Sequence, residues 1–211
     1  PLAIIQRLAH FDLLQFLLPS LRLDQRLTNI MQDTKRTLDW YRLLYLDIAY
    51  RPWLVYFLAL TARLSVKEVI EFCERFEVPE RHRTLIFKEK VEVSKIVRTF
   101  TQQPHLQSSE IYWLLQELSE EGLLHLMSMT RKKAGKKAVS LYVTKLRHTG
   151  TELNGDDLKE MGYRPGPLYR TIFNHLLEAR LDGQIQNRAD EIEFVLRHYP
   201  VEQVGSPSTG A

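Results

Sequence analysis

Residues 154–169 constrain this chain more than any other stretch, because glycine and proline fix the backbone at several of these positions. Asn154 or Asp156 can accept hydrogen bonds from the free N–H groups of a short helix that follows. Gly162 suits the left-handed backbone position just beyond the end of such a helix. The pattern therefore predicts a short capped helix that stops at Gly162.

A second helix is predicted to begin directly after this stop. Pro165 keeps Arg164 out of the α region, and Pro167 has its φ angle preset for the first position of a helix. Apolar residues then recur at helical spacing as far as residue 181, and Asp182-Gly183 ends the run. Because the first N–H groups of a helix lack intrahelical partners, we expect an anion-binding site at this helix start.

The same stretch resembles the C-terminal region of the bacterial tRNA nucleotidyltransferase and poly(A) polymerase family, the class II enzymes that add CCA, or its terminal A, to tRNA. Segments 40–44 and 53–56 are also similar to that family's helical body, so the resemblance covers about residues 2–199. The residues that match the C-terminal motif are Gly155, Asp157, Leu158, Gly162, Pro165, Gly166, Pro167, Leu181, Asp182 and Gly183.

The resemblance implies a role in tRNA processing without an active site in this chain. The family's metal-binding carboxylates follow a Gly-Ser loop in an N-terminal head, and nothing in this sequence matches that loop. We therefore expect the head, with its Mg²⁺ and ATP or CTP, to lie upstream of Pro1, and we assign no catalytic residue and no cofactor to this fragment. The expected function is to hold the tRNA 3′ end in place during template-independent nucleotide addition. CCA addition, A addition and poly(A) synthesis are not distinguished, nor is the oligomeric state.

The periodicity of apolar residues predicts an all-α fold, an elongated array of many helices. Gln102-Gln103-Pro104-His105 suggests a boundary, which gives a helical neck and body region at 1–103 and a helical body and tail region with the tRNA-binding surface at 104–199. Residues 200–211 are small and polar and are expected to form a flexible tail. Residues 138–147 would also suit a strand, but no partner strand is evident, so a helix is predicted.

Composition is that of a soluble globular protein, with 44% hydrophobic and 26% charged residues. No apolar run approaches the roughly 18 residues that cross a membrane. Cys73 is the only cysteine and cannot form an internal disulfide, which favours the cytoplasm, and the start at Pro1 shows no signal peptide. The whole chain has a formal charge of only +3, so a nucleic-acid partner is indicated by local charge rather than by net charge.

The positive charge is concentrated between Glu121 and Gly150, where seven basic residues accompany one acidic residue. A solvated loop of like charges and a phosphate-binding loop are equally compatible with this run, and the resemblance to a tRNA-binding family favours the second interpretation. Tyrosines near helix starts can stack on bases, although half-buried packing is their commoner role. The candidate RNA-binding residues are Arg131, Lys132, Lys133, Lys136, Lys137, Arg164, Gly166, Tyr169 and Arg170.

Four further residues are assigned structural roles in the glycine-proline motif, namely Gly155, Asp157, Gly162 and Pro167, since a carboxylate such as Asp157 would repel phosphate. The tryptophans are expected in the core, and residues 88–90 are expected on a solvated face. No metal site is predicted, because the histidines never fall within one helical turn of each other. The alternative function is a non-catalytic helical scaffold that binds acidic protein segments through its basic loop.

Overall fold

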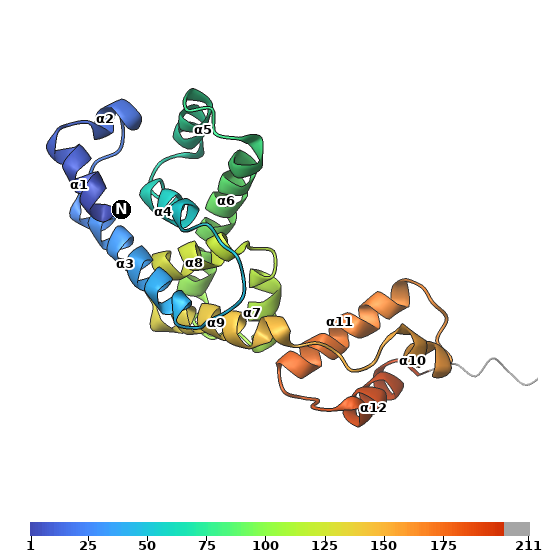
Figure 1. The fold of residues 1–211 in the computed structure, drawn as a ribbon. Coiled ribbons are helices and arrows are strands. Elements are labelled where there is room, and N and C mark those ends of the chain that lie inside the picture. The colour runs from blue at the N-terminus through green and yellow to red at the C-terminus, as the bar shows by residue number, and fades with distance from the viewer. Residues whose placement is uncertain (201–211) are drawn as a thin grey trace, which may run out of the picture. The chain divides into compact units, whose positions relative to one another are not determined.

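The computed structural model describes residues 1–200, and these residues form α-helices, short turns and no strand, so the all-α prediction is confirmed (Figure 1). Residues 201–211, most of the predicted tail, lie outside the described part of the chain. The helices are α1 (Leu2–His10), α2 (Leu14–Leu17), α3 (Gln25–Arg42), α4 (Pro52–Leu60), α5 (Val66–Arg75), α6 (Glu80–Gln102), α7 (Ser108–Leu115), α8 (Glu120–Met129), α9 (Lys133–Thr144), the 3-10 helix η1 (Leu146–His148), α10 (Gly155–Glu160), α11 (Pro167–Leu181) and α12 (Arg188–His198).

The chain divides into two compact units. Among the described residues, the first unit comprises residues 1–105 and 114–140, and the second comprises residues 106–113 and 141–200. The boundary that we place at 103–104 from the sequence lies near the first of these breaks. Residues 114–140, however, return to the first unit, because α8 packs among the earlier helices.

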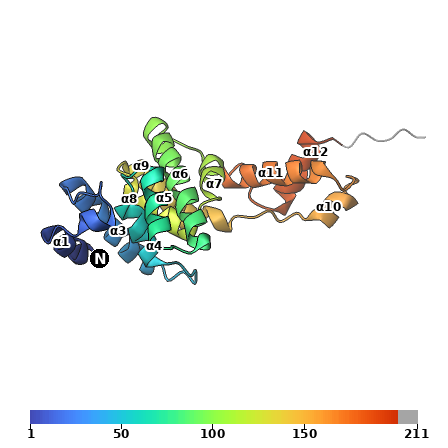
Figure 2. The same ribbon diagram turned by 90° about the horizontal axis from the view of Figure 1, so that it is seen from above.

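The first unit is built around α8, which packs against α3, α4 and α6 (Figure 1 and Figure 2). Every residue from Glu121 to Leu126 is buried, so this helix has no solvent face over most of its length. A helix that is buried all round must satisfy its polar side chains internally. This requirement accounts for the hydrogen bonds that buried polar residues make around α8.

The second unit has a smaller core between α10, α11 and α12 (Figure 1). Leu158 of α10, Ile172 and Leu176 of α11, and Val195 of α12 are all fully buried in it. These positions follow the helical spacing of the sequence, with Ile172 and Leu176 one turn apart on α11. The spacing thus places the motif of residues 154–169 on a packed scaffold.

Several helices begin at capping residues that can be recognised in the sequence. Ser65 and Glu68 carry the Ser-x-x-Glu pattern that is typical of a capping box, and they form a reciprocal capping box at the start of α5. Asn187 caps α12 in the same way, and Asp24 accepts a hydrogen bond from the Leu27 N–H at the start of α3. These signals are local in sequence, so they do not depend on tertiary packing.

Three segments show how the tertiary structure sets helix boundaries that local patterns leave open. The apolar run of residues 2–18 forms two helices, α1 and α2, because the chain turns at Asp12, whose φ is +54°. A glycine often marks the end of a helix, but Gly122 lies inside α8, where an added Cβ would come within 1.7 Å of the Glu89 carboxylate. Residues 138–144, which would also suit a strand, belong to helix α9.

Candidate RNA-binding surfaces

The basic run of residues 131–137 is not the loop that the sequence suggested. Only Arg131 and Lys132 lie in the connection after α8, and Lys133 begins α9. Lys136 and Lys137 therefore project from the first turns of that helix. Four of the five cations are exposed, and Lys136 is half-buried.

Two contacts fix this part of the chain against α6. Lys132 Nζ donates to the Thr101 carbonyl at 2.8 Å and so satisfies an acceptor in the last turn of α6. Gly135 is buried, and a Cβ there would lie 2.5 Å from Thr130 Cγ2 and 2.9 Å from the Phe100 ring. The glycine inside the basic run thus allows the start of α9 to approach α6 closely.

The charge at the start of α9 opposes the helix dipole. The N-terminal end of a helix carries partial positive charge and favours acidic side chains. The first turn of α9 contains no acidic residue, and Lys133, Lys136 and the preceding Lys132 add positive charge there instead. Such an arrangement is unfavourable for the isolated helix and favourable for binding an anion.

The stretch from Asn154 to Gly162 forms a capped helix and stop in the second unit. The Asn154 side chain accepts from the Asp156 and Asp157 N–H groups, while Asp157 accepts from the Asn154 N–H at 2.7 Å. Asp157 also receives both terminal nitrogens of Arg188, at 2.6 and 3.1 Å, and these hydrogen bonds hold the pKa of Asp157 below its usual value. Gly162 has a φ of +92°, the left-handed conformation that glycine adopts readily.

Pro167 is the first residue of α11, with Gly166 at the N-cap. This helix start has fewer backbone donors than the sequence analysis expected, because Pro167 has no N–H and the Tyr169 N–H donates to the Gly166 carbonyl. The Tyr169 hydroxyl donates to the Tyr163 carbonyl at 2.9 Å, so its contacts are those of a packing residue. Arg170, in contrast, is exposed, as is Arg164 just before the helix.

The candidate RNA-binding residues therefore fall into two groups. Arg131, Lys132, Lys133, Lys136 and Lys137 gather at the start of α9 in the first unit, and we call this group the α9 cluster. Arg164, Gly166, Tyr169 and Arg170 gather at the start of α11 in the second unit. Each group is a surface of its own unit.

Comparisons with known proteins agree with the motif. Over 201 residues the chain is 36% identical to the A-adding tRNA nucleotidyltransferase of Geobacter sulfurreducens, a match that covers 93% of this chain and 23% of that protein. The resemblance to tRNA nucleotidyltransferases is confirmed. The chain thus spans about a quarter of the length of this curated relative. No family model matches the sequence.

The fold is also shared with solved CCA-adding enzymes. The structure of the Thermotoga maritima CCA-adding enzyme complexed with tRNA superimposes with a TM-score of 0.73 at 18% identity, covering 94% of this chain and 47% of that one. A CCA-adding enzyme in complex with ATP gives a TM-score of 0.70 at 18% identity, covering 98% of this chain and 48% of that one. At this identity the likeness concerns the fold.

A metal ion such as the Mg²⁺ that the resemblance implies needs ligands that lie close together. Within residues 1–200, no group of three or more His, Cys, Asp or Glu side chains lies close enough together to hold a metal ion. The described residues thus present no such cluster of metal ligands, and no chemical step is assigned to a metal ion in this chain. In the same part of the chain, none of the helices combines the length and the apolar character needed to cross a membrane.

Sequence reasoning missed the polar residues buried around α8. Glu89 and Lys90 were expected on a solvated face, but both are buried, because they satisfy helix ends. Glu89 Oε1 accepts from the Ser119 N–H at 3.0 Å, and Lys90 Nζ donates to the Thr61 carbonyl at 2.6 Å. Burial raises the pKa of Glu89 and lowers that of Lys90.

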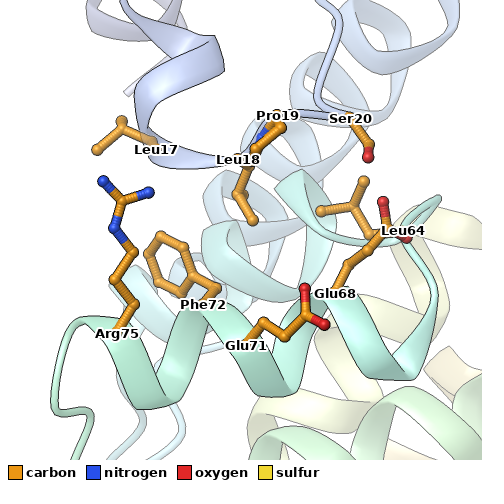
Figure 3. Close-up of a pocket in the computed structure, with 9 residues that line it drawn as sticks. All are labelled: Leu17, Leu18, Pro19, Ser20, Leu64, Glu68, Glu71, Phe72 and Arg75. Atoms are coloured by element: carbon orange, nitrogen blue, oxygen red, sulfur yellow. The ribbon is translucent and has the colours of Figure 1, made fainter.

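A pocket of about 250 Å³ in the first unit does not suit RNA. Figure 3 shows Phe72 and Arg75 of α5 facing Leu17 and Leu18 across it, with Glu68 and Glu71 also in its lining. Hydrogen bonds from Ser20 and Ser65 lower the pKa of Glu68 to about 2, so this residue is a carboxylate at neutral pH. Carboxylates in the lining would repel phosphate.

Proposed function

We propose that this chain is the tRNA-binding C-terminal region of a tRNA nucleotidyltransferase or poly(A) polymerase. The observation that carries the proposal is the α9 cluster, where exposed cations surround a helix start in a chain similar to an A-adding tRNA nucleotidyltransferase. The fold adds support, because the Thermotoga maritima CCA-adding enzyme with this fold was solved with tRNA bound.

Binding at the α9 cluster would follow from simple electrostatics. Arg131, Lys133 and Lys137 are exposed and placed to neutralise backbone phosphates, and the first N–H groups of α9 add donors. Lys132 also holds the end of α6, so its contribution to RNA binding would be smaller. Contacts of this kind read the shape and backbone of a duplex rather than its base sequence.

The start of α11 supplies a second, weaker contact in the proposal. Arg164 and Arg170 are exposed and can approach phosphates, whereas Gly166 lets the backbone come close to a ligand. Tyr169 has a packing role at this surface, since its hydroxyl donates to the Tyr163 carbonyl. We expect the two surfaces to contact different parts of one RNA.

By binding the body of the tRNA, the chain would hold the 3′ end in place for template-independent nucleotide addition. In this proposal the parent enzyme binds Mg²⁺ and ATP or CTP outside these 211 residues. We place the activity in the cytoplasm, because a single buried cysteine, Cys73, is typical of a reducing compartment.

The test is direct binding of a fluorescently labelled tRNA at fixed salt. The double variant Lys133→Ala and Lys137→Ala should bind at least about tenfold more weakly, because each lysine that contacts a phosphate releases condensed counterions. The matched control is Lys35→Ala with Lys67→Ala, which removes the same charge from exposed side chains elsewhere in the first unit. This control should retain at least about half of the wild-type affinity.

The scaffold alternative is decided by the same experiment with a labelled acidic peptide in a parallel arm. Our proposal predicts tight tRNA binding and weak peptide binding by the wild-type chain. Equal loss of tRNA affinity in both double variants would show only a general charge effect and would contradict the proposed site. Tight peptide binding together with negligible tRNA binding would favour the scaffold.

A further inference from the structure

Trp53 is exposed although it lies in the most apolar helix of the chain. The tryptophans were expected in the core, but 49% of the Trp53 surface is exposed at the second position of α4. Its ring stands edge-to-face against the His82 ring, with centroids 5.2 Å apart. The contact with His82 joins the starts of α4 and α6 and holds the indole at the surface.

Arg51, which precedes α4, is fixed beside Trp53 by a buried carboxylate. Its Nε and its backbone N–H both donate to Glu121 Oε1, at 2.8 and 2.9 Å. Burial raises the pKa of Glu121, but the hydrogen bonds from Arg51 outweigh this effect, so Glu121 stays ionised. The guanidinium side chain is nevertheless 44% exposed, which leaves its outer end accessible to a ligand.

Two further groups complete the surface. Arg51 Nη1 lies 3.3 Å from His82 Nδ1, and the adjacent Arg81 is exposed in the first turn of α6. Burial lowers the pKa of His82, as do the nearby charges of Arg81 and Arg51, which keeps the imidazole neutral as an acceptor for Arg51. Glu121 pairs with Arg51, and Glu80, which precedes Arg81 in the chain, pairs with Arg83.

An exposed indole that contacts His82, with the Arg51 guanidinium on the same imidazole and the exposed Arg81 next to His82 in the chain, matches the chemistry of a nucleotide. The face of an aromatic ring stacks on any base, and guanidinium groups bind phosphate. We propose that Trp53, Arg51 and Arg81 form a second RNA contact in the first unit, which takes an unpaired nucleotide with its base on Trp53 and its phosphate on the arginines. This inference rests on the proposed function, because it names a further part of the RNA that the chain holds.

The experiment compares two labelled probes, a short single-stranded oligoadenylate and a blunt RNA duplex of equal length. Trp53→Ala should weaken oligoadenylate binding about tenfold and leave duplex binding within about twofold, because only unpaired bases stack on a side chain. Trp53→Phe keeps an aromatic face and should restore affinity to within about threefold of the wild type. Arg81→Ala should reduce the salt dependence of oligoadenylate binding by about 0.7 per phosphate contact.

Phe16→Ala is the matched control, since Phe16 is 63% exposed on α2 of the same unit and lies outside this cationic surface. It should bind both probes like the wild type, and the circular dichroism spectrum should be unchanged in every variant. Unchanged oligoadenylate binding by Trp53→Ala, with duplex binding intact, would overturn this inference alone. Failure of the wild-type chain to bind either probe would instead overturn the proposed function.

Discussion

At the scale of single residues, the first unit buries polar side chains that lack a full set of hydrogen bonds. His125 lies in the middle of α8 and is almost completely buried, and its Nδ1 has no hydrogen-bond partner in the structure. Burial lowers the pKa of His125 to about 3, and the nearby charge of Lys90 acts in the same direction. The folded chain therefore holds this imidazole neutral.

His125 should make the chain sensitive to acid. Because the pKa is lower in the folded state than in the unfolded state, the stabilisation is complete above about pH 6.5 and is lost as the pH falls towards 3. The expected slope is up to about 1.4 kcal/mol of unfolding free energy per pH unit between pH 6 and pH 4.5. Urea unfolding of the wild type and of His125→Leu at several pH values measures this slope.

The Leu variant should show a shallower loss of stability over this pH range than the wild type. Replacement of the exposed His105 by Leu is the control and should keep the wild-type slope. Identical slopes in the wild type and His125→Leu would mean that the buried imidazole takes up a proton without unfolding, contrary to this account.

Gly135 is a second residue whose role is set by close packing. Gly135→Ala would place a methyl group against Thr130 and Phe100, so we expect a loss of about 1–2 kcal/mol despite the better helix propensity of alanine. Gly150→Ala is the control, because a Cβ there would meet nothing within 4 Å. A higher melting temperature for Gly135→Ala would refute the close approach of α9 to α6.

At the scale of helices, the charge of the side chains at the start of α9 has opposite effects on the stability of the fold and on RNA binding. Lys133→Glu should raise the free energy of unfolding by about 0.5 kcal/mol, because an acidic side chain suits the N-terminal dipole of α9. The same change should weaken RNA binding, since it puts a carboxylate where a phosphate is proposed to lie. Thermal melts and tRNA titrations on one preparation would test both signs, and a variant that loses both stability and binding would contradict the account.

The cap of α10 gives a prediction for the second unit. Asn154→Ala removes the acceptor for the Asp156 and Asp157 N–H groups and should cost about 1 kcal/mol. Asn174→Ala, an exposed position on α11, serves as the control and should change stability by less than half as much. Melting of the second unit can be followed by hydrogen exchange of the α10 and α11 amides.

Features set by neighbouring residues were the ones that the sequence predicted well. The caps at Ser65 and Asn187 and the start of α11 at Pro167 depend on residues within one helical turn. The burial of Glu89 and Lys90 depends instead on Ser119 and Thr61, about thirty positions away along the chain. Charge pattern alone assigns such residues to the surface, because it does not reveal which helix ends will meet them.

The candidate surfaces show the same difference between features set by neighbouring residues and features set by distant ones. The sequence identified the cations of residues 131–137, but it did not show that most of them stand in the first turns of α9. It also placed Trp53 in the core on the strength of an apolar helix, whereas packing against His82 leaves the indole half exposed. Both corrections concern the direction in which a side chain points, which is set by contacts between helices.

At the scale of the whole molecule, two units each present basic residues, and we propose that both sets bind one polyanion. The α9 cluster belongs to the first unit, and Arg164 with Arg170 belongs to the second. If both bind the same RNA, loss of either group should weaken tRNA binding without unfolding the other unit. The start of α11 offers fewer free backbone N–H groups than the sequence suggests, because Pro167 has none. Arg164→Ala with Arg170→Ala should accordingly weaken tRNA binding less than Lys133→Ala with Lys137→Ala, as measured by filter binding.

The most direct test of the central claim is the salt dependence of tRNA binding. The slope of log affinity against log salt is about −0.9 for each neutralised phosphate of a duplex. Titrations at several salt concentrations should show that Lys133→Ala with Lys137→Ala flattens the slope by about two units, and that Lys35→Ala with Lys67→Ala does not. A slope that stays unchanged in the first double variant would contradict the assignment of the α9 cluster to phosphate binding.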